Sequence, residues 1–529
     1  MFRYGQLRHA RFATFGFDLG IYDQAGWLVA FGEPGLITIR GLEVWGHHGT
    51  FVFFLLAPGY WLGGGPTWLL FAQVASQASG AIALFLLVRD VCGRGGRWLG
   101  VVAGAALLLN PTQQFLVWEY FHPESFAVGP LLFAWWALRT ERWRVFAIAA
   151  FVAMLCKEDV VLAVAMMGVL IAISSPRSRT TLQIGATTIV VALAWYVAVT
   201  RWMIPHYNPG GAFYEQQFFT DFGTSMGEVL WTAVSHPIDT LRFITRDGHL
   251  EWYRRMLYPV AGLCLLRPKV MLVAAPMIGV ALLADEGHSW VRDARYHYSA
   301  IVSAVAVLAA VEALMWIRRR TVDLDGVRQA ALVVAMVVVV AALAATRVWG
   351  VAPGARDAST RLYWPLQPGE SPLDVVLGVD VRADPVAAAK QDAVGAVPAH
   401  ARVSASYNID PHLTHRRFVY QFPNPWIGEN WAVDGEGQHD PATIQWIVVD
   451  RGLLRGTTGS RDEAIRSTLA HLLSDEFEVV RETEGVVLAR RVAPPSCIDD
   501  PSGMVRAWAN PDHYNTSAPP STGKVCPVT

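Results

Sequence analysis

Ten apolar runs, separated by short polar turns, occupy most of residues 66–346, and this alternation limits the fold more than any other feature of the sequence. A helix needs about 20 apolar residues to cross the hydrocarbon core of a bilayer, and fewer where it is broken inside protein. We therefore expect one polytopic α-helical bundle of about ten transmembrane helices. The runs lie at approximately 66–88, 98–117, 126–138, 145–156, 160–174, 182–203, 256–267, 270–284, 297–317 and 329–346.

Charged residues are distributed unevenly along the chain. They make up 16% of all residues, against about 25% in an ordinary soluble domain. Residues 351–529 hold 38 of them, whereas the much longer stretch 1–350 holds 49. A membrane part therefore precedes a water-soluble part. The formal net charge of −1 provides no basic field, which argues against a nucleic-acid partner.

Lysine and arginine in the short loops predict the orientation of the bundle, because basic residues near helix ends stay on the cytoplasmic side. Five alternating loops hold 14 basic residues, whereas the loops between them hold only Lys157, Arg292 and Arg295. The first set is therefore predicted to be cytoplasmic. By parity, the N-terminal segment, the loop 204–255 and the C-terminal part face outward across the plasma membrane. The five basic loops are 89–97, 139–144, 175–181, 267–269 and 318–328.

Every short turn on the predicted outer face carries titratable side chains. Carboxylates close to a bilayer are costly, so they are functional candidates. A group of histidines and carboxylates can also bind a divalent metal, with His47 and His48 as candidate ligands, although no HxxxH or HExxH spacing is present. The stretches are Phe17-Asp18-Leu19-Gly20-Ile21-Tyr22-Asp23-Gln24, Trp45-Gly46-His47-His48, Glu119-Tyr120-Phe121-His122-Pro123-Glu124, Lys157-Glu158-Asp159 and Arg292-Asp293-Ala294-Arg295-Tyr296-His297-Tyr298.

These motifs, in this order, resemble the bacterial polytopic membrane proteins known as domain of unknown function 2079 (DUF2079). The resemblance runs from about residue 10 to residue 490. That family is in turn similar to the GT-C superfamily of integral membrane glycosyltransferases, which use polyprenyl-phosphate sugars. The resemblance implies a GT-C-like bundle with a small extracytoplasmic α/β C-terminal domain. In the C-terminal part it is carried by Val403-Ser404-Ala405-Ser406, Pro411-His412-Leu413, Arg416 and Tyr420-Gln421-Phe422-Pro423.

The implied activity is transfer of a sugar from a polyprenyl-phosphate donor to a cell-envelope glycan or glycoprotein on the outer face. Such a site needs an apolar groove for the lipid, cations for the phosphate and a base for the acceptor hydroxyl. Asp18 is the expected catalytic base, with Asp23 as the second candidate. The expected substrate-binding residues are His122, Glu124, Lys157, Glu158, Asp159, Arg295, His297 and Tyr298.

Other functions remain open at this stage. A transporter or flippase of a lipid-linked or polar substrate is one, although transporters tend to show internal repeats and mid-membrane charges, and no repeat is found here. A non-catalytic envelope scaffold is another. The turn Lys157-Glu158-Asp159 can also be read as a self-neutralised connection, and His122-Pro123 as a simple helix start.

The residue pattern divides the chain into an extracytoplasmic N-terminal segment, 1–65, a transmembrane bundle, 66–346, an α/β domain, 350–490, and a flexible tail, 491–529. Within the α/β domain the periodicity predicts a helix over 461–473 and a hairpin over 477–490. Cys497 and Cys526 share the oxidising compartment on this topology and are predicted to form a disulfide.

Three arginines near the start, Arg3, Arg8 and Arg11, stand before an outward segment, contrary to the positive-inside tendency. Relatives in the family usually have one helix ahead of the Asp-Leu-Gly motif, whereas 17 residues precede Asp18 here. We expect that a missing first helix accounts for this disagreement.

Overall fold

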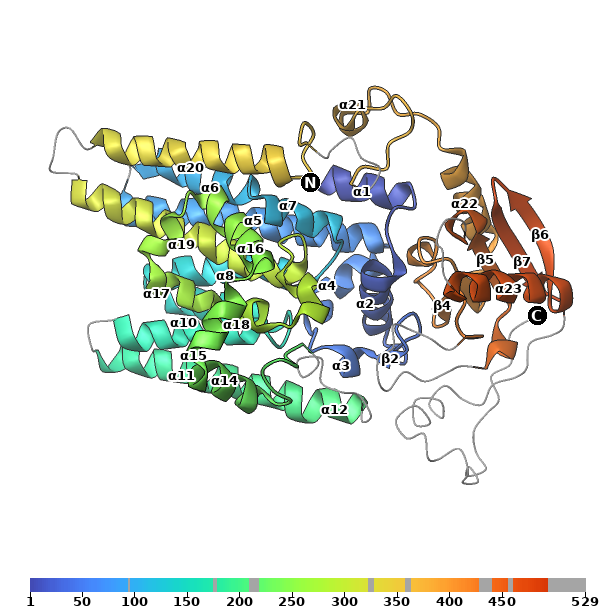
Figure 1. Cartoon of the computed structure of the whole chain (residues 1–529), viewed down its shortest axis with the longest axis horizontal. Helices are drawn as coiled ribbons and strands as arrows, with labels where there is room; N and C mark the ends of the chain where they lie inside the picture. The colour runs from blue at the N-terminus through green and yellow to red at the C-terminus, as the bar shows by residue number, and fades with distance from the viewer. Residues whose placement is uncertain are drawn as a thin grey trace.

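The computed structural model has a long helical body with an α/β unit at one end (Figure 1). Cys497 and Cys526, the predicted tail beyond residue 492, and two basic loop residues, Arg94 and Arg177, lie outside the described residues. The expected fold class, a polytopic helical bundle followed by a small α/β unit, is confirmed. The structure describes residues 1–93, 96–174, 178–208, 218–321, 328–356, 363–427, 440–454 and 460–492.

The bundle is built around α19 (Ala300–Thr321), in which residues 300–317 are apolar except for Ser303 and Glu312. Within His297–Arg319, 89% of the most apolar stretch of 18 residues is buried inside the protein. The corresponding share is 22% for Leu332–Trp349 in α20 (Arg328–Trp349). A helix that is apolar all round belongs in a core or a membrane. Helix α19 contacts α20, α5 (Pro66–Cys92), α6 (Arg97–Leu108) and α8 (Pro123–Arg139). Further out, α9 (Trp143–Met154) packs against α8, and α11 (Arg179–Val197) packs against α10 (Val160–Ser174).

Four helical segments among the described residues are long and apolar enough to cross a membrane: Pro66–Cys92, Arg179–Tyr207, His297–Arg319 and Leu332–Trp349. A fifth arises if α6 and α7 (Pro111–Trp118), bent by 44° at their junction, form one span. The expectation of about ten spanning helices is thus not confirmed. Shorter apolar helices are Val52–Trp61, Trp143–Met154, Val160–Ile173 and Pro268–Leu283.

Two of the differences have local causes. The apolar run 256–267 does not continue as a helix, because Ala261 and Gly262 have φ values of +50° and +69° and separate two 3₁₀ turns. Conversely, α4 (Val52–Trp61) lies in the segment that the sequence suggested was outside the bundle. Its ten residues are too few to cross a bilayer alone.

The polar turns gather at two ends of the bundle. The Arg142 guanidinium lies 3.1 Å from the Asp90 carboxylate, and the Arg318 guanidinium donates to the Cys92 carbonyl, so three of the basic loops meet at one end. His48 and Glu158 join two of the other turns at the end that faces the α/β unit. This grouping is the one that strict alternation requires. Which end faces the cytoplasm stays a prediction.

The N-terminal arginines are bound within the structure. On α1 (Phe2–Ala10), Arg8 is buried and donates to the Tyr363 carbonyl and the Tyr120 hydroxyl. Arg11 forms a two-pronged ion pair with Glu370. These contacts connect α1 to the segment that follows α20, so both arginines have a structural role. The positive-inside rule considers only their charge and does not take such contacts into account.

The C-terminal unit contains a five-stranded mixed sheet of order β4-β3-β5-β7-β6. β3 (Val403–Ala405) pairs in parallel with β4 (Val419–Gln421) and β5 (Trp446–Asp450), and β7 (Val486–Arg491) pairs antiparallel with β5 and β6 (Phe477–Thr483). The predicted hairpin over 477–490 is confirmed as β6–β7, and the predicted helix over 461–473 as α23. The unit also contains α21 (Pro372–Leu377), α22 (Pro385–Ala396) and α23 (Ser460–Asp475).

Residues 12–24 and 407–421 form a seam between the bundle and the α/β unit. The Gly16 N–H donates to the Tyr407 carbonyl at 2.7 Å, and the Asn408 amide donates to the Phe12 carbonyl. On the next helix, α2 (Ile21–Phe31), Gln24 donates to the Arg416 carbonyl at 3.2 Å. The first sequence motif is therefore held between the two parts of the molecule.

Gly16 is the tightest point of this seam. A Cβ at residue 16 would lie 2.1 Å from an Asp410 carboxyl oxygen. Asp410 is fully buried, neither carboxyl oxygen has a hydrogen-bond partner among the described residues, and burial raises its pKa well above the ordinary value. Burial thus opposes ionisation of Asp410, and its carboxyl group leaves no room beside Gly16.

Gly16→Ala should lower the thermal midpoint of the detergent-solubilised protein, because the added methyl overpacks the seam at a cost of about 1–3 kcal/mol. Asp410→Ala in the same chain should restore most of the loss, since it removes the atoms that the methyl meets. The measurement is a double-mutant cycle of thermal midpoints. Strictly additive effects of the two substitutions would contradict this account.

Glu370 predicts a pH-dependent contribution to stability. The hydrogen bonds from Arg11, aided by the backbone N–H groups of Gln367 and Arg382, lower the Glu370 pKa from 4.5 to about 2. Because the folded pKa is depressed, the stabilisation is present above pH 4.5 and is lost as the pH falls toward 2. Glu370→Gln should therefore lower the thermal midpoint at pH 7, and the gap to wild type should narrow between pH 5 and pH 3.

Glu478→Gln serves as the matched control, because Glu478 lies on the surface and 4.0 Å from Arg490. It should leave the midpoint unchanged, since such exposed pairs contribute about 0–1 kcal/mol. A Glu370→Gln deficit that stays constant down to pH 3 would show that the Arg11 pair is not its source.

Candidate active site

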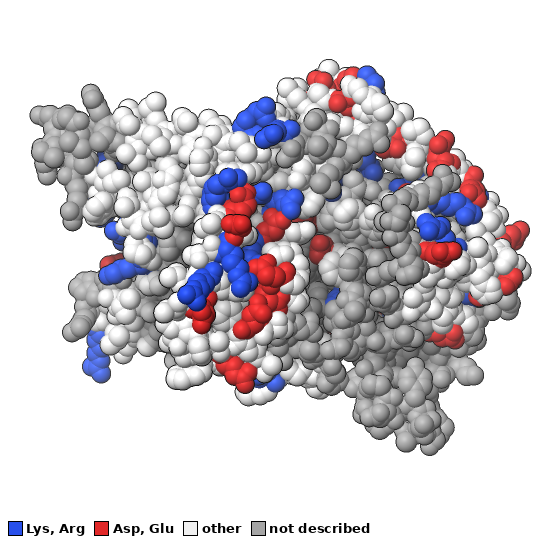
Figure 2. Space-filling view, viewed as in Figure 1, with Lys and Arg blue, Asp and Glu red and all other residues white. Residues whose placement is uncertain are grey.

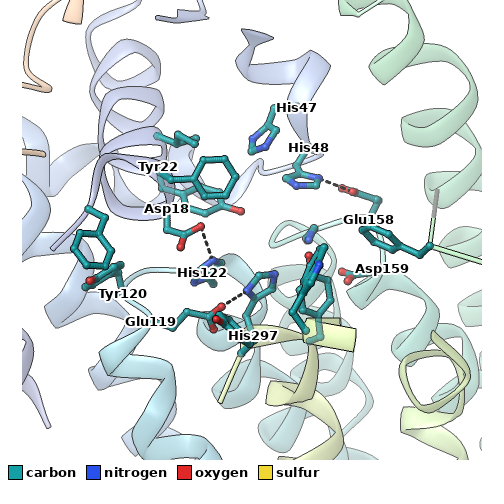
Figure 3. A pocket seen from close by; sticks show the side chains of 18 of the residues that line it. Asp18, Tyr22, His47, His48, Glu119, Tyr120, His122, Glu158, Asp159 and His297 are labelled. Atoms are coloured by element: carbon teal, nitrogen blue, oxygen red, sulfur yellow. Dashed lines mark hydrogen bonds and ion pairs between the residues drawn. The ribbon is translucent and has the colours of Figure 1, made fainter. Parts of the chain in front are cut away.

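A cavity of about 670 Å³ lies where the polar end of the bundle meets the α/β unit (Figure 3). Its wall comes from segments that are far apart in the sequence, including the first motif, the four other polar stretches of the predicted outer face and two residues of the α/β unit, Tyr407 and Gln421. Among the residues expected from the sequence, those that line it are Asp18, His47, His48, His122, Lys157, Glu158, Asp159, His297 and Tyr298.

Asp18 projects from a short π-helical turn, Gly16–Gly20, that leads into α2. Its backbone has φ +23° and ψ −81°, a conformation that L-residues rarely adopt. Tyr120, another lining residue, also has positive φ, +78°. Such strain costs about 1–3 kcal/mol per residue and is found mainly where function requires a fixed geometry. The Asp18 side chain is 29% exposed, so its carboxylate is accessible from the cavity.

His122 and His297 form a stacked pair next to Asp18. Their ring centroids are 3.9 Å apart and the rings are 13° from parallel. The His122 Nε2 atom lies 3.4 Å from Asp18 Oδ1, and His297 Nδ1 lies 2.9 Å from Glu119 Oε1. A hydrogen bond from the His122 backbone N–H to the Gln73 side chain, 2.7 Å long, fixes the start of α8 beneath them. The three dashed contacts in Figure 3 show this layer and the neighbouring His48–Glu158 pair.

Lys157 and Glu158, in the turn between α9 and α10, are each bonded to another segment. The Lys157 ammonium pairs with Glu124, and both side chains are buried. Burial alone lowers a lysine pKa, but the Glu124 and Asp159 carboxylates outweigh it and raise the pKa of Lys157. Glu158 accepts from His48 at 2.8 Å and from the Gly49 N–H at 2.9 Å. The turn is therefore part of a wider network and is not neutralised within itself.

The pKa values of Glu158 and Glu119 are shifted in opposite directions. Burial opposes ionisation of Glu158, but the contacts with His48, Lys157 and Gly49 outweigh it and lower its pKa to about 2. Burial and the neighbouring Asp18 and Glu124 carboxylates raise the pKa of Glu119 well above the ordinary value. The surroundings therefore favour ionisation of Glu158 and oppose ionisation of Glu119.

Aromatic rings make up much of the remaining wall. Phe15 packs against Tyr120 at 5.7 Å and against Tyr407 of the α/β unit at 5.0 Å between centroids. Rings of this kind suit the apolar chain of a lipid and the faces of sugar rings alike. The other aromatic lining residues are Phe17, Tyr22, Trp118, Phe218, Trp290, Tyr296 and Tyr298.

Asp23 and Arg295, which the sequence placed in the site, do not line the cavity. Asp18 lies on the irregular turn ahead of α2, whereas Asp23 lies in the first turn of α2 itself. It is fully buried, accepts from the Tyr60 and Thr414 hydroxyls and lies 3.2 Å from His415. Arg295 is held by Asp293, two residues earlier, and by the Tyr363 hydroxyl.

Glu124 is also behind the wall, where it holds Lys157. The lining residues that the sequence-based list omitted include Glu119, Tyr407 and Gln421. Glu119 belongs to the same polar stretch as His122 and was detectable from it, whereas Tyr407 and Gln421 reach the cavity only through packing of the α/β unit. The structure also brings together one group of three candidate metal ligands among the described residues, Glu119, His122 and His297, whose ligand atoms lie within 4.8 Å of one another. His47 and His48, the candidates from the sequence, are not in this group.

Two crystal structures of ArnT from Cupriavidus metallidurans are similar to this chain. The apo structure matches with a TM-score of 0.49 and the structure bound to undecaprenyl phosphate with 0.45; each is 12% identical in sequence, with 91% of this chain and 94% of that chain covered. No curated protein matches the sequence. The sequence model of a family described as "Predicted membrane protein (DUF2079)" matches residues 8–488. The chain therefore belongs to the DUF2079 family of predicted membrane proteins.

Proposed function

We propose that this protein is an integral membrane glycosyltransferase-like enzyme, which transfers a sugar from a polyprenyl-phosphate donor to a cell-envelope acceptor. The observation that carries the proposal is the position of Asp18, an accessible carboxylate on a constrained turn, in the same cavity as Lys157, at the polar end of an apolar bundle. The resemblance of the family to the GT-C superfamily supports the donor class.

The residues have suitable chemistry for this transfer. Asp18 accepts the proton of the acceptor hydroxyl as that oxygen attacks the anomeric carbon, and the polyprenyl phosphate departs with the electron pair of the broken bond. His122 Nε2, 3.4 Å from Asp18, orients the carboxylate. Because phosphate is a good leaving group, no paired general acid is required. Cationic donors such as Lys157 stabilise the charge that develops on it.

A route for the lipid chain leads from the bilayer into the cavity. The helical segment Arg179–Tyr207 is apolar, and only 17% of its most apolar stretch of 18 residues is buried inside the protein. Most of its surface is therefore available to lipid. Near its end, Trp202 is 71% exposed, while Ile204 and Pro205 line the cavity. A polyprenyl chain lying along this helix would bring its phosphate to the polar wall.

Asp18→Asn should reduce sugar transfer by about 10²–10⁴-fold, the usual contribution of a positioned base, while leaving folding intact because the volume is unchanged. The measurement is turnover of purified protein with a polyprenyl-phosphate sugar that the wild type consumes. Asp392→Asn, on an exposed face of α22, is the control and should retain full turnover. Wild-type turnover by Asp18→Asn would remove Asp18 from the mechanism.

Lys157→Ala should weaken binding of undecaprenyl phosphate more than binding of the acceptor. Loss of a charge-assisted contact to phosphate costs about 1.5–3 kcal/mol, which corresponds to a roughly 10- to 100-fold rise in Kd. Binding to protein in detergent micelles is the measurement. Lys390→Ala is a closely matched control, since Lys390 forms an equally buried pair with Asp450 outside the cavity.

The double variant Lys157→Met/Glu124→Gln separates phosphate binding from folding, because it removes both charges of the buried pair at once. It should fold and still bind undecaprenyl phosphate weakly. Equal weakening of donor and acceptor in all Lys157 variants would favour a structural role for this turn. Movement of lipid-linked sugar across liposomes by wild type, without transfer to any acceptor, would replace the enzyme with a transporter.

A further inference from the structure

The cavity has a surplus of acidic groups. Its lining residues include four carboxyl groups, on Asp18, Glu119, Glu158 and Asp159, and among the described residues of the wall only Lys157 is a lysine or arginine. The charge of Lys157 is already engaged by Glu124. An anionic ligand would therefore meet an acidic wall with little positive charge available to it.

The stacked histidines lie at the centre of this acidic wall. Glu119, His122 and His297 each offer one ligand atom, and these atoms lie within 4.8 Å of one another. In a tetrahedral site with bonds of about 2.1 Å, ligand atoms are about 3.4 Å apart. Small side-chain rotations would bring the three to this spacing, and they belong to segments with well-packed helices on either side.

Unpartnered polar atoms mark the same place. Glu119 is 4% exposed and His122 is 1% exposed, yet Glu119 Oε2 and His122 Nδ1 have no hydrogen-bond partner among the described residues. Buried polar atoms are rarely left in this condition. The hydrogen bond that Glu119 Oε1 makes with His297 Nδ1 leaves Nε2 as the second nitrogen of that ring, 3.7 Å from Glu124.

We propose that Glu119, His122 and His297 bind one divalent transition-metal ion, with the Asp18 carboxylate next to the site. Two imidazole nitrogens and one carboxylate oxygen are the donors that Zn²⁺ prefers, and a three-ligand site leaves a coordination position open. Mg²⁺ would be a poorer fit, because it takes oxygen ligands in strict octahedral geometry.

The ion would supply positive charge that the wall lacks. If the cavity binds a donor phosphate, as proposed above, the ion would lie next to Asp18 and in the same cavity as Lys157. Metal binding itself does not depend on that function, because it rests only on the three side chains and their surroundings. The two proposals can therefore fail separately.

The test is binding of Zn²⁺ and Mn²⁺ to the full-length protein in detergent, without donor or acceptor. After chelator treatment and gel filtration, metal content and Kd are measured by mass spectrometry and competition with a chromogenic chelator. We expect one Zn²⁺ per chain, bound more tightly than Mn²⁺, and an increase in thermal midpoint on addition of Zn²⁺. Glu119→Gln and His297→Ala should each raise the Kd at least tenfold and reduce this increase.

Matched variants make the result specific. His471→Ala removes an exposed histidine that pairs with Asp475 at 2.8 Å on α23, and it should keep the bound ion. Glu119→Gln preserves volume, and its thermal midpoint in the presence of chelator should equal that of wild type, which separates folding from binding. Retention of the ion by both Glu119→Gln and His297→Ala, or its loss only when His47 and His48 are replaced, would overturn the proposal. So would a wild type that binds no ion, or binds an adventitious ion only, with no fixed stoichiometry.

Discussion

A buried charge must have a partner, and at the polar end of this bundle that requirement joins turns that are remote in sequence. Removing one member of a buried ion pair costs about 3–5 kcal/mol, because the other charge is then left in a medium that cannot solvate it. Lys157 therefore holds the start of α8 through Glu124, and Glu158 holds the segment before α4 through His48. The cavity exists because these contacts cross between elements and fix the turns around a common space.

The seam between the bundle and the α/β unit also depends on a buried charged group. Asp23 does not face the cavity, yet it accepts hydrogen bonds from Tyr60 on α4 and Thr414 in the α/β unit. One buried carboxylate thus ties together the motif helix, the bundle and the C-terminal part. Five residues earlier along the same motif, Asp18 is exposed to the cavity. Two aspartates that look equivalent in the sequence thus have different roles, because Asp18 lies on the strained turn and Asp23 on the helix that follows it.

The order of apolar runs and polar turns predicts which turns lie at the same end of the bundle, but it does not predict which helices span the bilayer. Alternation of apolar runs and polar turns correctly groups the turns of His48, His122, Lys157 and His297, because parity along a bundle depends only on the order of the helices. It cannot decide which short run crosses the bilayer, as the turns around Ala261 show.

The sequence-based list of site residues differs from the cavity lining where tertiary contacts decide the position of a side chain. Arg295 forms an ion pair with Asp293, two residues earlier, and does not line the cavity. Tyr407 lines the cavity because the loop after β3 lies beside Gly16. Arg8 and Arg11 likewise contact Tyr363 and Glu370, which lie more than 350 residues further along the chain. Such contacts between distant residues depend on tertiary packing, so secondary-structure propensities and hydrophobic periodicity do not predict them.

Backbone strain links the two layers. Asp18 and Tyr120 hold positive φ angles, at about 1–3 kcal/mol each, and such conformations persist only where surrounding contacts overdetermine them. For Asp18 those contacts are the Gly16–Tyr407 hydrogen bond and the close approach of Asp410; for Tyr120 they are the hydrogen bonds of its hydroxyl with Arg8 and the Ala13 carbonyl. The α/β unit and α1 therefore act on the cavity through the backbone. Loosening the seam would let Asp18 relax toward ordinary φ values and move its carboxylate away from His122, so docking of the α/β unit and the geometry of the proposed base are coupled.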